Sequence, residues 1–587
     1  MKKTFNKNSR GRRHPRSARQ SAGPLRTGQA GQATTAGVLK LDSPARAQWF
    51  LAVLTCACMF PFLGEAFHID DPLFLATAKQ IVQHPLDPYG FSVVWYTTGM
   101  PMSEVTKNPP LAAYFLALVG SWAGWSEQVL HLAFLVPALV VILGVYHLAR
   151  ELTESPVIAA CATLVAPGFL VSANSVMCDV PMLAVWIVAI ILWRKGLTNS
   201  RLLWLVASGV LIGVCALTKY FGGCLIPLLF LYTIASKRRF ERSLLLLLIP
   251  VAMLVSYQAW THSQYGHGLL SDATSYVSLA RSDHPNSTAG VGLIAMCFVG
   301  GCTLPALFFA PLLWPRTWIL GGGILAVLGA AAIVNGWVSI ENPFPDRNRT
   351  FLAVQFGMFV LGGISALALA AADFWRRQTA DSILLTAWVL GTFIFAAFFN
   401  WTVNARSILP LIPAVGLLIA RRLDDTPLRS RWSSLWTGAP IILSLVLGLW
   451  IAGGDAALAN SARTAAGKIH QRAVRASTRV LFMGHWGFQY YMESFGAQPI
   501  DLSRTELTPL DVVVRPENNT NVVPLPPRSS TKVLTIEMKA WVTTMRAENG
   551  AGFYSSVWGP MPFAFGPVPP ERYDSFRFSG SIAVPDE

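Results

Sequence analysis

Asp70 and Asp71 are adjacent acids in the longest polar interruption of an otherwise apolar first half, which runs from Glu65 to Pro110. Acids placed just outside a membrane-spanning helix are costly near lipid, so a pair of them indicates a working site. A carboxylate at a membrane surface can take the proton of an attacking hydroxyl group. Either acid can also serve as a helix cap, because Asp before Pro commonly begins a helix.

A third acid and several isolated basic residues suit the same chemistry. Lys and Arg side chains neutralise a phosphate group as it leaves. Together with a carboxylate base they predict group transfer from a lipid-borne phosphate, with the sugar of a polyprenyl-phosphate donor as the transferred group. The alternatives are a helix N-cap for the acid and snorkelling to the membrane interface for the bases. The candidates are Asp179 as the third acid and Lys107, Lys219, Arg281 and Arg406 as donor or phosphate contacts.

The composition is that of a polytopic membrane protein. Of 587 residues, 53% are hydrophobic and 13% charged, whereas soluble domains carry roughly 25% charged residues. The net charge of +15 would suit nucleic acid, but 11 of the 46 basic residues lie in the first 46 positions and most others separate apolar runs. This distribution is an orientation signal and argues against a nucleic-acid partner. The eight cysteines fall in or beside apolar segments and are expected to be small core residues.

Thirteen apolar stretches predict thirteen membrane crossings by α-helices. A fourteenth candidate, Leu111–Trp125, is expected to lie on the outer surface as an amphipathic helix, because its crossing would place most basic loop residues outside. The predicted spans are Trp49–Leu63, Val129–Leu148, Val157–Val171, Pro181–Trp193, Leu202–Leu217, Tyr220–Ala235, Leu244–Trp260, Val291–Leu313, Trp318–Val338, Phe351–Ala371, Ser382–Phe399, Ser407–Ala420 and Gly438–Ala452.

The sequence predicts three parts. Residues 1–46 form a disordered basic tail in the cytoplasm. Residues 47–453 form the transmembrane domain, with a first outer loop at 65–128 and a second at 261–290. Residues 454–587 form a small extracytoplasmic α/β domain, with strands at Arg479–Met483, Asp511–Val514 and Lys532–Ile536 and a helix at Phe488–Phe495. Its aromatic run from Gly484 to Tyr491 either grips a sugar or an acceptor, or packs against the membrane domain.

Four motifs follow one another as in the GT-C glycosyltransferases of family 39, which include protein O-mannosyltransferases and the lipid A aminoarabinose transferase. The resemblance covers roughly residues 49 to 422 and implies a GT-C fold with the C-terminal domain of the aminoarabinose-transferase branch. By this resemblance Asp70 matches the catalytic base, Asp179 the second outer-loop acid, and Lys219 and Arg406 the bases that face the lipid phosphate. The motifs are Asp70-Asp71, Asn108-Pro109-Pro110-Leu111, Met177-Cys178-Asp179-Val180-Pro181 and Leu217-Thr218-Lys219.

The sequence departs from the family at two points. The familiar acidic pair is Asp-Glu, whereas here it is Asp70-Asp71, so either acid can be the base. The aminoarabinose branch places Lys directly before Pro, whereas here Asn108 stands there and Lys107 precedes it, which argues against that particular substrate. The family is generally metal-independent, so no cofactor is expected, although Asp70 and Asp179 could hold a divalent cation.

The resemblance implies a multi-pass enzyme of the plasma membrane that moves one sugar from a polyprenyl-phosphate donor to a lipid, glycan or protein acceptor, with inversion at the anomeric carbon. Its predicted partners are that donor, that acceptor and the bilayer. A secondary transporter is one alternative, but it predicts charges buried mid-span and an inverted repeat, which the sequence lacks. A non-catalytic protein of envelope-polysaccharide assembly is the other.

Overall fold

The computed structural model describes residues 43–282, 287–341, 344–346, 348–426, 433–476, 478–503, 505–508, 511–524, 530–577 and 582–583. Residues 1–42 of the basic tail predicted at 1–46 lie outside the described residues. The first helix begins at Pro44, where the Ser43 hydroxyl accepts the backbone N–H of Arg46 as an N-cap.

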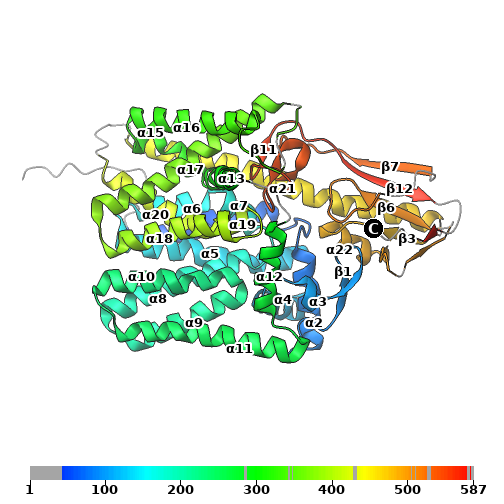
Figure 1. Cartoon of the computed structure of the whole chain (residues 1–587), viewed down its shortest axis with the longest axis horizontal. Helices are drawn as coiled ribbons and strands as arrows, with labels where there is room; N and C mark the ends of the chain where they lie inside the picture. Colours follow the sequence, from blue (N-terminus) through cyan, green and yellow to red (C-terminus); the bar gives the residue numbers. More distant parts are fainter. Residues whose placement is uncertain are drawn as a thin grey trace, which may run out of the picture.

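Long apolar helices form a bundle that runs along the long axis of the molecule (Figure 1). Within the described residues, nine helices are long and apolar enough to cross a membrane singly, and a bent pair makes up to ten. The bundle comprises α1 (Pro44–Met59), α5 (Glu127–Leu152), α6 (Pro156–Leu164), α7 (Pro167–Ala173), α8 (Asp179–Asn199), α9 (Leu202–Thr218), α10 (Leu225–Lys237), α11 (Leu248–Tyr265), α13 (Thr288–Cys302), α14 (Leu304–Phe308), α15 (Ala310–Leu313), α16 (Arg316–Val334), α17 (Arg349–Arg377), α18 (Ala380–Ile394), α19 (Ala405–Ile408), α20 (Ile412–Asp424) and α21 (Ser433–Ala476).

Each predicted span is helical in the structure, which confirms the predicted class of polytopic helical membrane protein. Three of them are shorter or interrupted: α9, α13 and the segment from α19 to α20. The pair α6 and α7 bends by 61° at a break before Pro167, because proline cannot continue the hydrogen-bond ladder of a helix.

Small residues let α13 and α17 pack almost backbone to backbone. A Cβ atom added at Gly300 would lie 1.8 Å from the Phe359 carbonyl oxygen, and one at Gly363 would lie 2.1 Å from the Met296 carbonyl oxygen. Such close contact between helices in lipid requires glycine on both faces. These two helices therefore form a fixed wall beside α19, which carries Arg406.

The first predicted outer loop, from Glu65 to Gln128, folds against one end of the bundle, which we call the domain end (Figure 1). The Asn108 carbonyl there accepts the Tyr89 hydroxyl, and Glu127 accepts the Tyr491 hydroxyl of the C-terminal domain. Helix α4 thus starts and finishes at the domain end without traversing the bundle, as predicted for Leu111–Trp125. The loop holds α2 (Asp71–Gln83), β1 (Ser92–Val94), β2 (Gly99–Pro101), α3 (Met102–Val105) and α4 (Leu111–Ala123), and the second predicted outer loop holds α12 (Leu269–Ser282).

A mixed five-stranded sheet in the order β4-β3-β6-β12-β7 forms the centre of the C-terminal domain. Strand β3 pairs in parallel with β4 and β6, and β12 pairs antiparallel with β6 and β7. The predicted strands and helix of this region are confirmed. The elements are β3 (Val480–Phe482), α22 (Trp486–Ser494), β4 (Gln498–Pro499), β5 (Glu506–Leu507), β6 (Val512–Pro516), β7 (Ser530–Ile536), β8 (Val542–Thr543), β9 (Met545–Arg546), β10 (Ala551–Gly552), β11 (Ala564–Phe565), β12 (Glu571–Arg577) and β13 (Ile582–Ala583).

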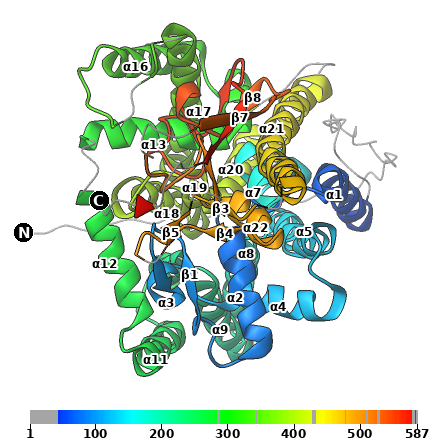
Figure 2. The same cartoon turned by 90° about the vertical axis from the view of Figure 1, so that its right-hand side faces the viewer.

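Helix α21 enters this domain without a break, because its 44 residues extend from the bundle to the start of the sheet. Seen from the domain end, β3, β4 and α22 lie in front of the bundle near its centre (Figure 2). The aromatic run of α22 packs in two directions: Phe488 is buried against Phe482 and Tyr573 of the domain, and the Tyr491 hydroxyl accepts the backbone N–H of Phe67, in the first predicted outer loop, at 2.9 Å. Of the two predicted roles for this run, the structure shows packing.

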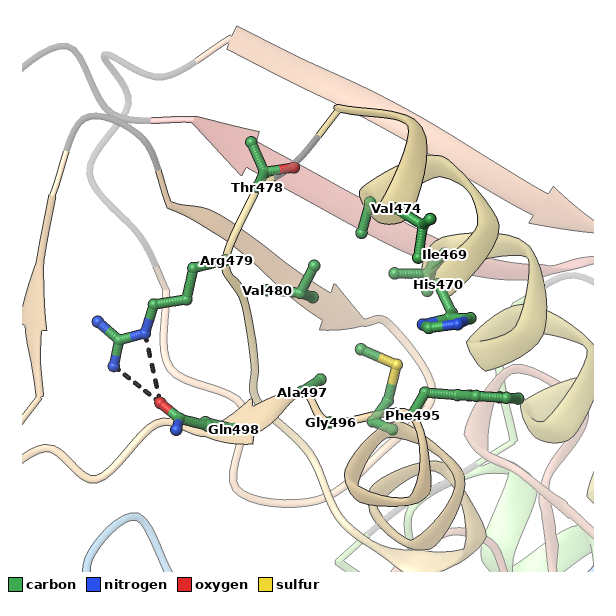
Figure 3. A pocket seen from close by; sticks show the side chains of 12 residues that line it. Ile469, His470, Val474, Thr478, Arg479, Val480, Phe495, Gly496, Ala497 and Gln498 are labelled. Carbon is green, nitrogen blue, oxygen red and sulfur yellow. Dashed lines mark hydrogen bonds between the residues drawn. The ribbon is translucent and has the colours of Figure 1, made fainter.

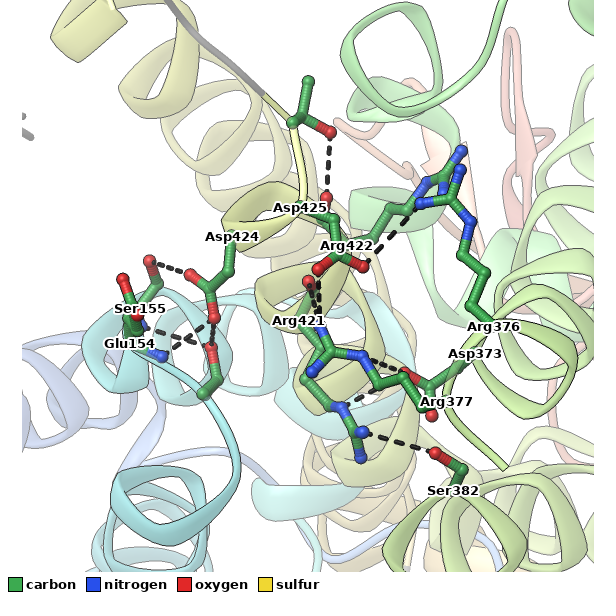
Figure 4. A network of polar contacts seen from close by, with 12 residues as sticks. Glu154, Ser155, Asp373, Arg376, Arg377, Ser382, Arg421, Arg422, Asp424 and Asp425 are labelled. Carbon is green, nitrogen blue, oxygen red and sulfur yellow. Dashed lines mark hydrogen bonds and ion pairs between the residues drawn. The ribbon is translucent and has the colours of Figure 1, made fainter. Parts of the chain in front are cut away.

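At the opposite end of the bundle, ion pairs connect α17 with the end of α20, and a hydrogen bond from Arg421 to Ser382 adds α18 (Figure 4). Arg421 is 4% exposed and pairs with Asp373 at 3.1 Å, and Arg377 pairs with Asp425 at 2.7 Å. Asp424 accepts the hydroxyl of Ser155. Breaking one member of such a buried network is costly, so these contacts hold the ends of the three helices together.

Candidate functional site

The turn from His68 to Asp71 sets the geometry of the site. Ile69 has a φ of +46°, a left-handed conformation that is strained for a β-branched residue. The turn is closed twice: the Asp71 N–H donates to the His68 carbonyl at 3.0 Å, and the His68 N–H donates to the Asp71 carboxylate at 2.8 Å. The strain is thus held by Asp71, and it presents Asp70 toward the bundle.

Asp71 connects two loops that are far apart in sequence. Its carboxylate is 1% exposed and also accepts the backbone N–H of Val176 at 3.1 Å, in the turn that precedes Asp179. Burial raises the pKa of Asp71 to about 8, although the two backbone hydrogen bonds act against that rise. Asp71 therefore holds the turn of Asp70 and the turn of Asp179 together.

Asp70 faces a cation. It occupies the N-cap position of α2, yet its carboxylate pairs with the Arg406 guanidinium at 2.9 Å. The Asp70 side chain is 28% exposed, which makes it the accessible acid of the two. Asn404 fixes the start of α19 beneath Arg406, because its side-chain oxygen accepts the Ser407 N–H at 2.8 Å.

A second acid–base pair lies beside the first. Asp179 begins α8 and is 1% exposed, and its carboxylate pairs with Lys219, which follows α9, at 2.5 Å. The charges of Asp70, Arg406, Asp179 and Lys219 all reach the buried thiol of Cys178, so the two pairs are neighbours. Within the site, Asp179 Oδ2 and Arg406 Nε are buried and have no hydrogen-bond partner among the described residues.

The structure places the other two predicted bases outside these pairs. Lys107 donates to the Glu104 carbonyl at 2.6 Å and lies 5.3 Å from the centre of the Tyr276 ring. Arg281 donates to the carbonyls of Asn400 and Ala397 at 3.0 and 3.3 Å, at the end of the segment that follows α18. Lys107 is a neighbour of the site, whereas Arg281 contacts the backbone of another element.

Sequence reasoning missed a group of buried residues behind Asp71. Glu65 and Asp455 are 5% and 3% exposed, and burial together with the charge of Asp455 raises the pKa of Glu65 well above its usual range. Tyr554, from the C-terminal domain, donates its hydroxyl to Asp455 at 2.8 Å. Burial lowers the pKa of His68, which lies beside them. An acid inside an apolar helix, as Asp455 is in α21, was the available signal.

A pocket lies away from these pairs, in the C-terminal domain between the end of α21 and α22 (Figure 3). It has a volume of about 490 Å³ and is lined by His470, Arg479 and Phe495 among others. The His470 and Phe495 rings stack on each other at 4.7 Å, and Arg479 donates to Gln498. Its polar groups are thus engaged within the domain, and none of the predicted site residues lines it.

No group of three or more His, Cys, Asp or Glu side chains in the described part of the chain is arranged to hold a metal ion. Metal independence stays a prediction from the sequence, as do the catalytic roles of the acids and bases.

Two acid–base pairs at one end of a bundle of apolar helices, beside a domain with strands, define a class: a multi-pass membrane protein with a charged site at the end of its helices. Residues 107–260 match the family described as dolichyl-phosphate-mannose-protein mannosyltransferase. This match confirms the resemblance to the family 39 glycosyltransferases. It includes Lys107, Asp179 and Lys219, whereas Asp70 and Arg406 lie outside it.

Similar solved structures come from three organisms. The Archaeoglobus fulgidus oligosaccharyltransferase, tethered with an acceptor peptide, is 12% identical over 77% of this chain and 63% of its own, with a TM-score of 0.46. ArnT from Cupriavidus metallidurans, bound to undecaprenyl phosphate, is 14% identical over 81% and 94%, with a TM-score of 0.41. The arabinosyltransferase EmbB from Mycobacterium smegmatis is 15% identical over 79% and 44%, with a TM-score of 0.34. No curated protein matches the chain in sequence. The chain thus spans less than two thirds of the oligosaccharyltransferase.

Proposed function

We propose that this protein is a membrane glycosyltransferase that moves a sugar from a polyprenyl-phosphate donor to an acceptor on the outer face of the plasma membrane. The observation that carries the proposal is the accessible Asp70 carboxylate beside Arg406, next to the buried pair of Asp179 and Lys219. The family match over residues 107–260 supports a sugar donor carried on a lipid phosphate.

The two pairs have the charges that such a transfer requires. Asp70 takes the proton of the acceptor hydroxyl group as its oxygen forms the new bond to the anomeric carbon. The bond from that carbon to the phosphate oxygen breaks, and its electron pair stays on the phosphate. Attack from the side opposite the leaving group inverts the anomeric carbon. Arg406 and Lys219 stabilise the charge on the departing polyprenyl phosphate.

The structure favours Asp70 over Asp71 as the base. Asp71 is 1% exposed and both its oxygens accept backbone N–H groups, so an acceptor cannot reach it without breaking the turn. Asp179 is equally buried, and we assign it to orienting Lys219. Lys107 is bonded to the Glu104 carbonyl and lies over the Tyr276 ring, and the carbonyl contacts of Arg281 favour a structural role, so we assign the donor phosphate to Arg406 and Lys219.

The test is turnover in lipid nanodiscs. The purified protein is incubated with a panel of polyprenyl-phosphate sugars and with envelope extract as acceptor, and free polyprenyl phosphate is measured by mass spectrometry. We expect release with one donor and loss of that release in Asp70→Asn. Donor binding without release, by the wild-type protein and across the whole panel, would refute the enzyme and indicate a non-catalytic assembly protein.

The acceptor can be identified separately. Mass analysis of envelope glycans from cells with and without the protein should show one glycan that loses a single sugar residue. Unchanged glycans under conditions in which the protein is expressed would contradict the proposed function.

A further inference from the structure

Tyr554 extends from the C-terminal domain into the candidate site. It follows β10, and its side chain is buried, with 4% exposed. The face of its ring lies 5.6 Å from the Arg406 guanidinium carbon. On another side, its ring meets the His68 ring edge to face, with 5.7 Å between centres. Tyr554 thus contacts Arg406 itself and His68, which begins the turn that carries Asp70.

The backbone around Tyr554 is bonded to the segment that leads into Arg406. The Ala405 N–H donates to the Phe553 carbonyl at 2.8 Å, and the Ser556 N–H donates to the Val403 carbonyl at 2.8 Å. The Thr402 hydroxyl lies 2.9 Å from the Ser556 hydroxyl. The loop 553–556 therefore runs along residues 402–405 and fixes the backbone from which Arg406 projects.

The orientation of the Tyr554 ring is itself fixed. Its hydroxyl donates to one oxygen of Asp455 at 2.8 Å, and the Thr544 hydroxyl donates to the other oxygen of the same carboxylate. Asp455 lies on α21, the helix that connects the bundle to the domain. The ring is thus held from both the domain and the bundle.

Arg406 needs such support, because an arginine side chain has many rotamers and only one of its nitrogens is engaged. Its Nη1 contacts Asp70 and the Met177 sulfur, and its Nε has no partner among the described residues. When Asp70 takes a proton from an acceptor, the charge that holds the guanidinium is neutralised. An aromatic face keeps its attraction for a cation at that moment.

We propose that Tyr554 is a positioning residue for the transfer reaction: its ring holds the Arg406 guanidinium where the donor phosphate binds. The C-terminal domain is thereby a part of the donor site. The inference rests on the proposed function, because it assigns the phosphate to Arg406.

The experiment measures binding of undecaprenyl phosphate to the full-length protein in nanodiscs by native mass spectrometry. The variants are Tyr554→Phe, which keeps the ring, Tyr554→Leu, which removes it, and Arg406→Ala. A matched control is Tyr573→Leu, which removes a ring of the same domain that is 3% exposed, lies on β12 and contacts Phe488.

We expect Tyr554→Leu to weaken binding by about 3- to 30-fold, the range of a desolvated cation–aromatic contact. Tyr554→Phe should weaken binding less, because it keeps the ring although it loses the bond to Asp455. In the Arg406→Ala background, Tyr554→Leu should have no further effect, because the residue it positions is gone. Tyr573→Leu should change binding by less than about twofold, because Tyr573 lies on β12 and its ring packs on Phe488 within the domain.

Equal binding by Tyr554→Leu and the wild type would overturn the inference and leave the proposed function standing. An equal loss in Tyr573→Leu, or a full further loss in the Arg406→Ala background, would also overturn it, since either result indicates general damage to the domain. If the wild-type protein binds no undecaprenyl phosphate, the lipid-donor function itself is refuted.

Discussion

Replacing Asp70 and Asp71 one at a time by Asn should separate chemistry from structure. Asp70→Asn removes the proposed base, so we expect the rate of transfer to fall by about 10²- to 10⁴-fold, which corresponds to roughly 3 to 5 kcal/mol in the barrier. Its effect on stability should be small, about 0 to 1 kcal/mol, because the pair with Arg406 is partly exposed.

Asp71→Asn should act mainly on stability. The Asp71 carboxylate accepts the backbone N–H groups of His68 and Val176, and an amide has one acceptor oxygen for the two. One buried N–H is left without a partner, which costs about 1 to 3 kcal/mol. The strained turn at Ile69 loses one of its two closing bonds as well, so the apparent melting temperature should fall.

The assay is release of polyprenyl phosphate, paired with thermal unfolding of each variant in the same nanodiscs. Asp574→Asn is the control, because Asp574 pairs with Arg515 at 3.1 Å and is 22% exposed, close to the 28% of Asp70. It should change neither quantity. Full transfer by Asp70→Asn, or loss of transfer by Asp71→Asn at an unchanged melting temperature, would refute the assignment of the two acids.

Three further predictions concern the surroundings of the site. Lys219→Met should destabilise the protein by about 3 to 5 kcal/mol, because it leaves the buried Asp179 charge without its partner. Adding Asp179→Asn should restore most of the lost unfolding temperature. A double variant as unstable as Lys219→Met would contradict a buried ion pair. The raised pKa of Asp71, about 8, means that the folded state holds a proton that the unfolded state releases near pH 4, so stability should fall as the pH rises from about 4 to 8. The melting temperature of Asp71→Asn should not show this fall between pH 4 and 8. If the melting temperatures of the wild type and of Asp71→Asn change with pH in the same way, Asp71 is not the source of the fall. Tyr491→Phe should leave the Phe67 N–H without an acceptor, at a cost of about 1 to 3 kcal/mol in stability. We expect faster proteolysis of the C-terminal domain in this variant, and a rate equal to that of the wild type would contradict the prediction.

The sequence alone was sufficient to predict the helix bundle and the position of the acidic and basic side chains at one of its ends. Apolar runs separated by basic residues predict both the crossings and their order, and that order alone places Asp70, Asp179 and Lys219 at the same end. The pairing of Asp179 with Lys219 across the hairpin of α8 and α9 agrees with this prediction.

The partners within the site were beyond sequence reasoning. Arg406 reaches Asp70 across 336 positions, and no local pattern selects one arginine over another for such a contact. Arg281 illustrates this, since it has the same side chain but bonds to the carbonyls of Ala397 and Asn400. Tyr554 lies in a Gly- and Pro-rich stretch whose conformation depends on bonds to distant segments, and local propensity contains no information about those bonds.

The uninterrupted course of α21 gives the C-terminal domain a helical attachment to the bundle. A helix of 44 residues is about 66 Å long, and it connects the two parts without an intervening loop. Because Asp455 on this helix holds Tyr554 of the domain, a movement of the helix would also move the ring beside Arg406. Under the proposed function, we expect an acceptor to reach Asp70 without a swing of the whole domain.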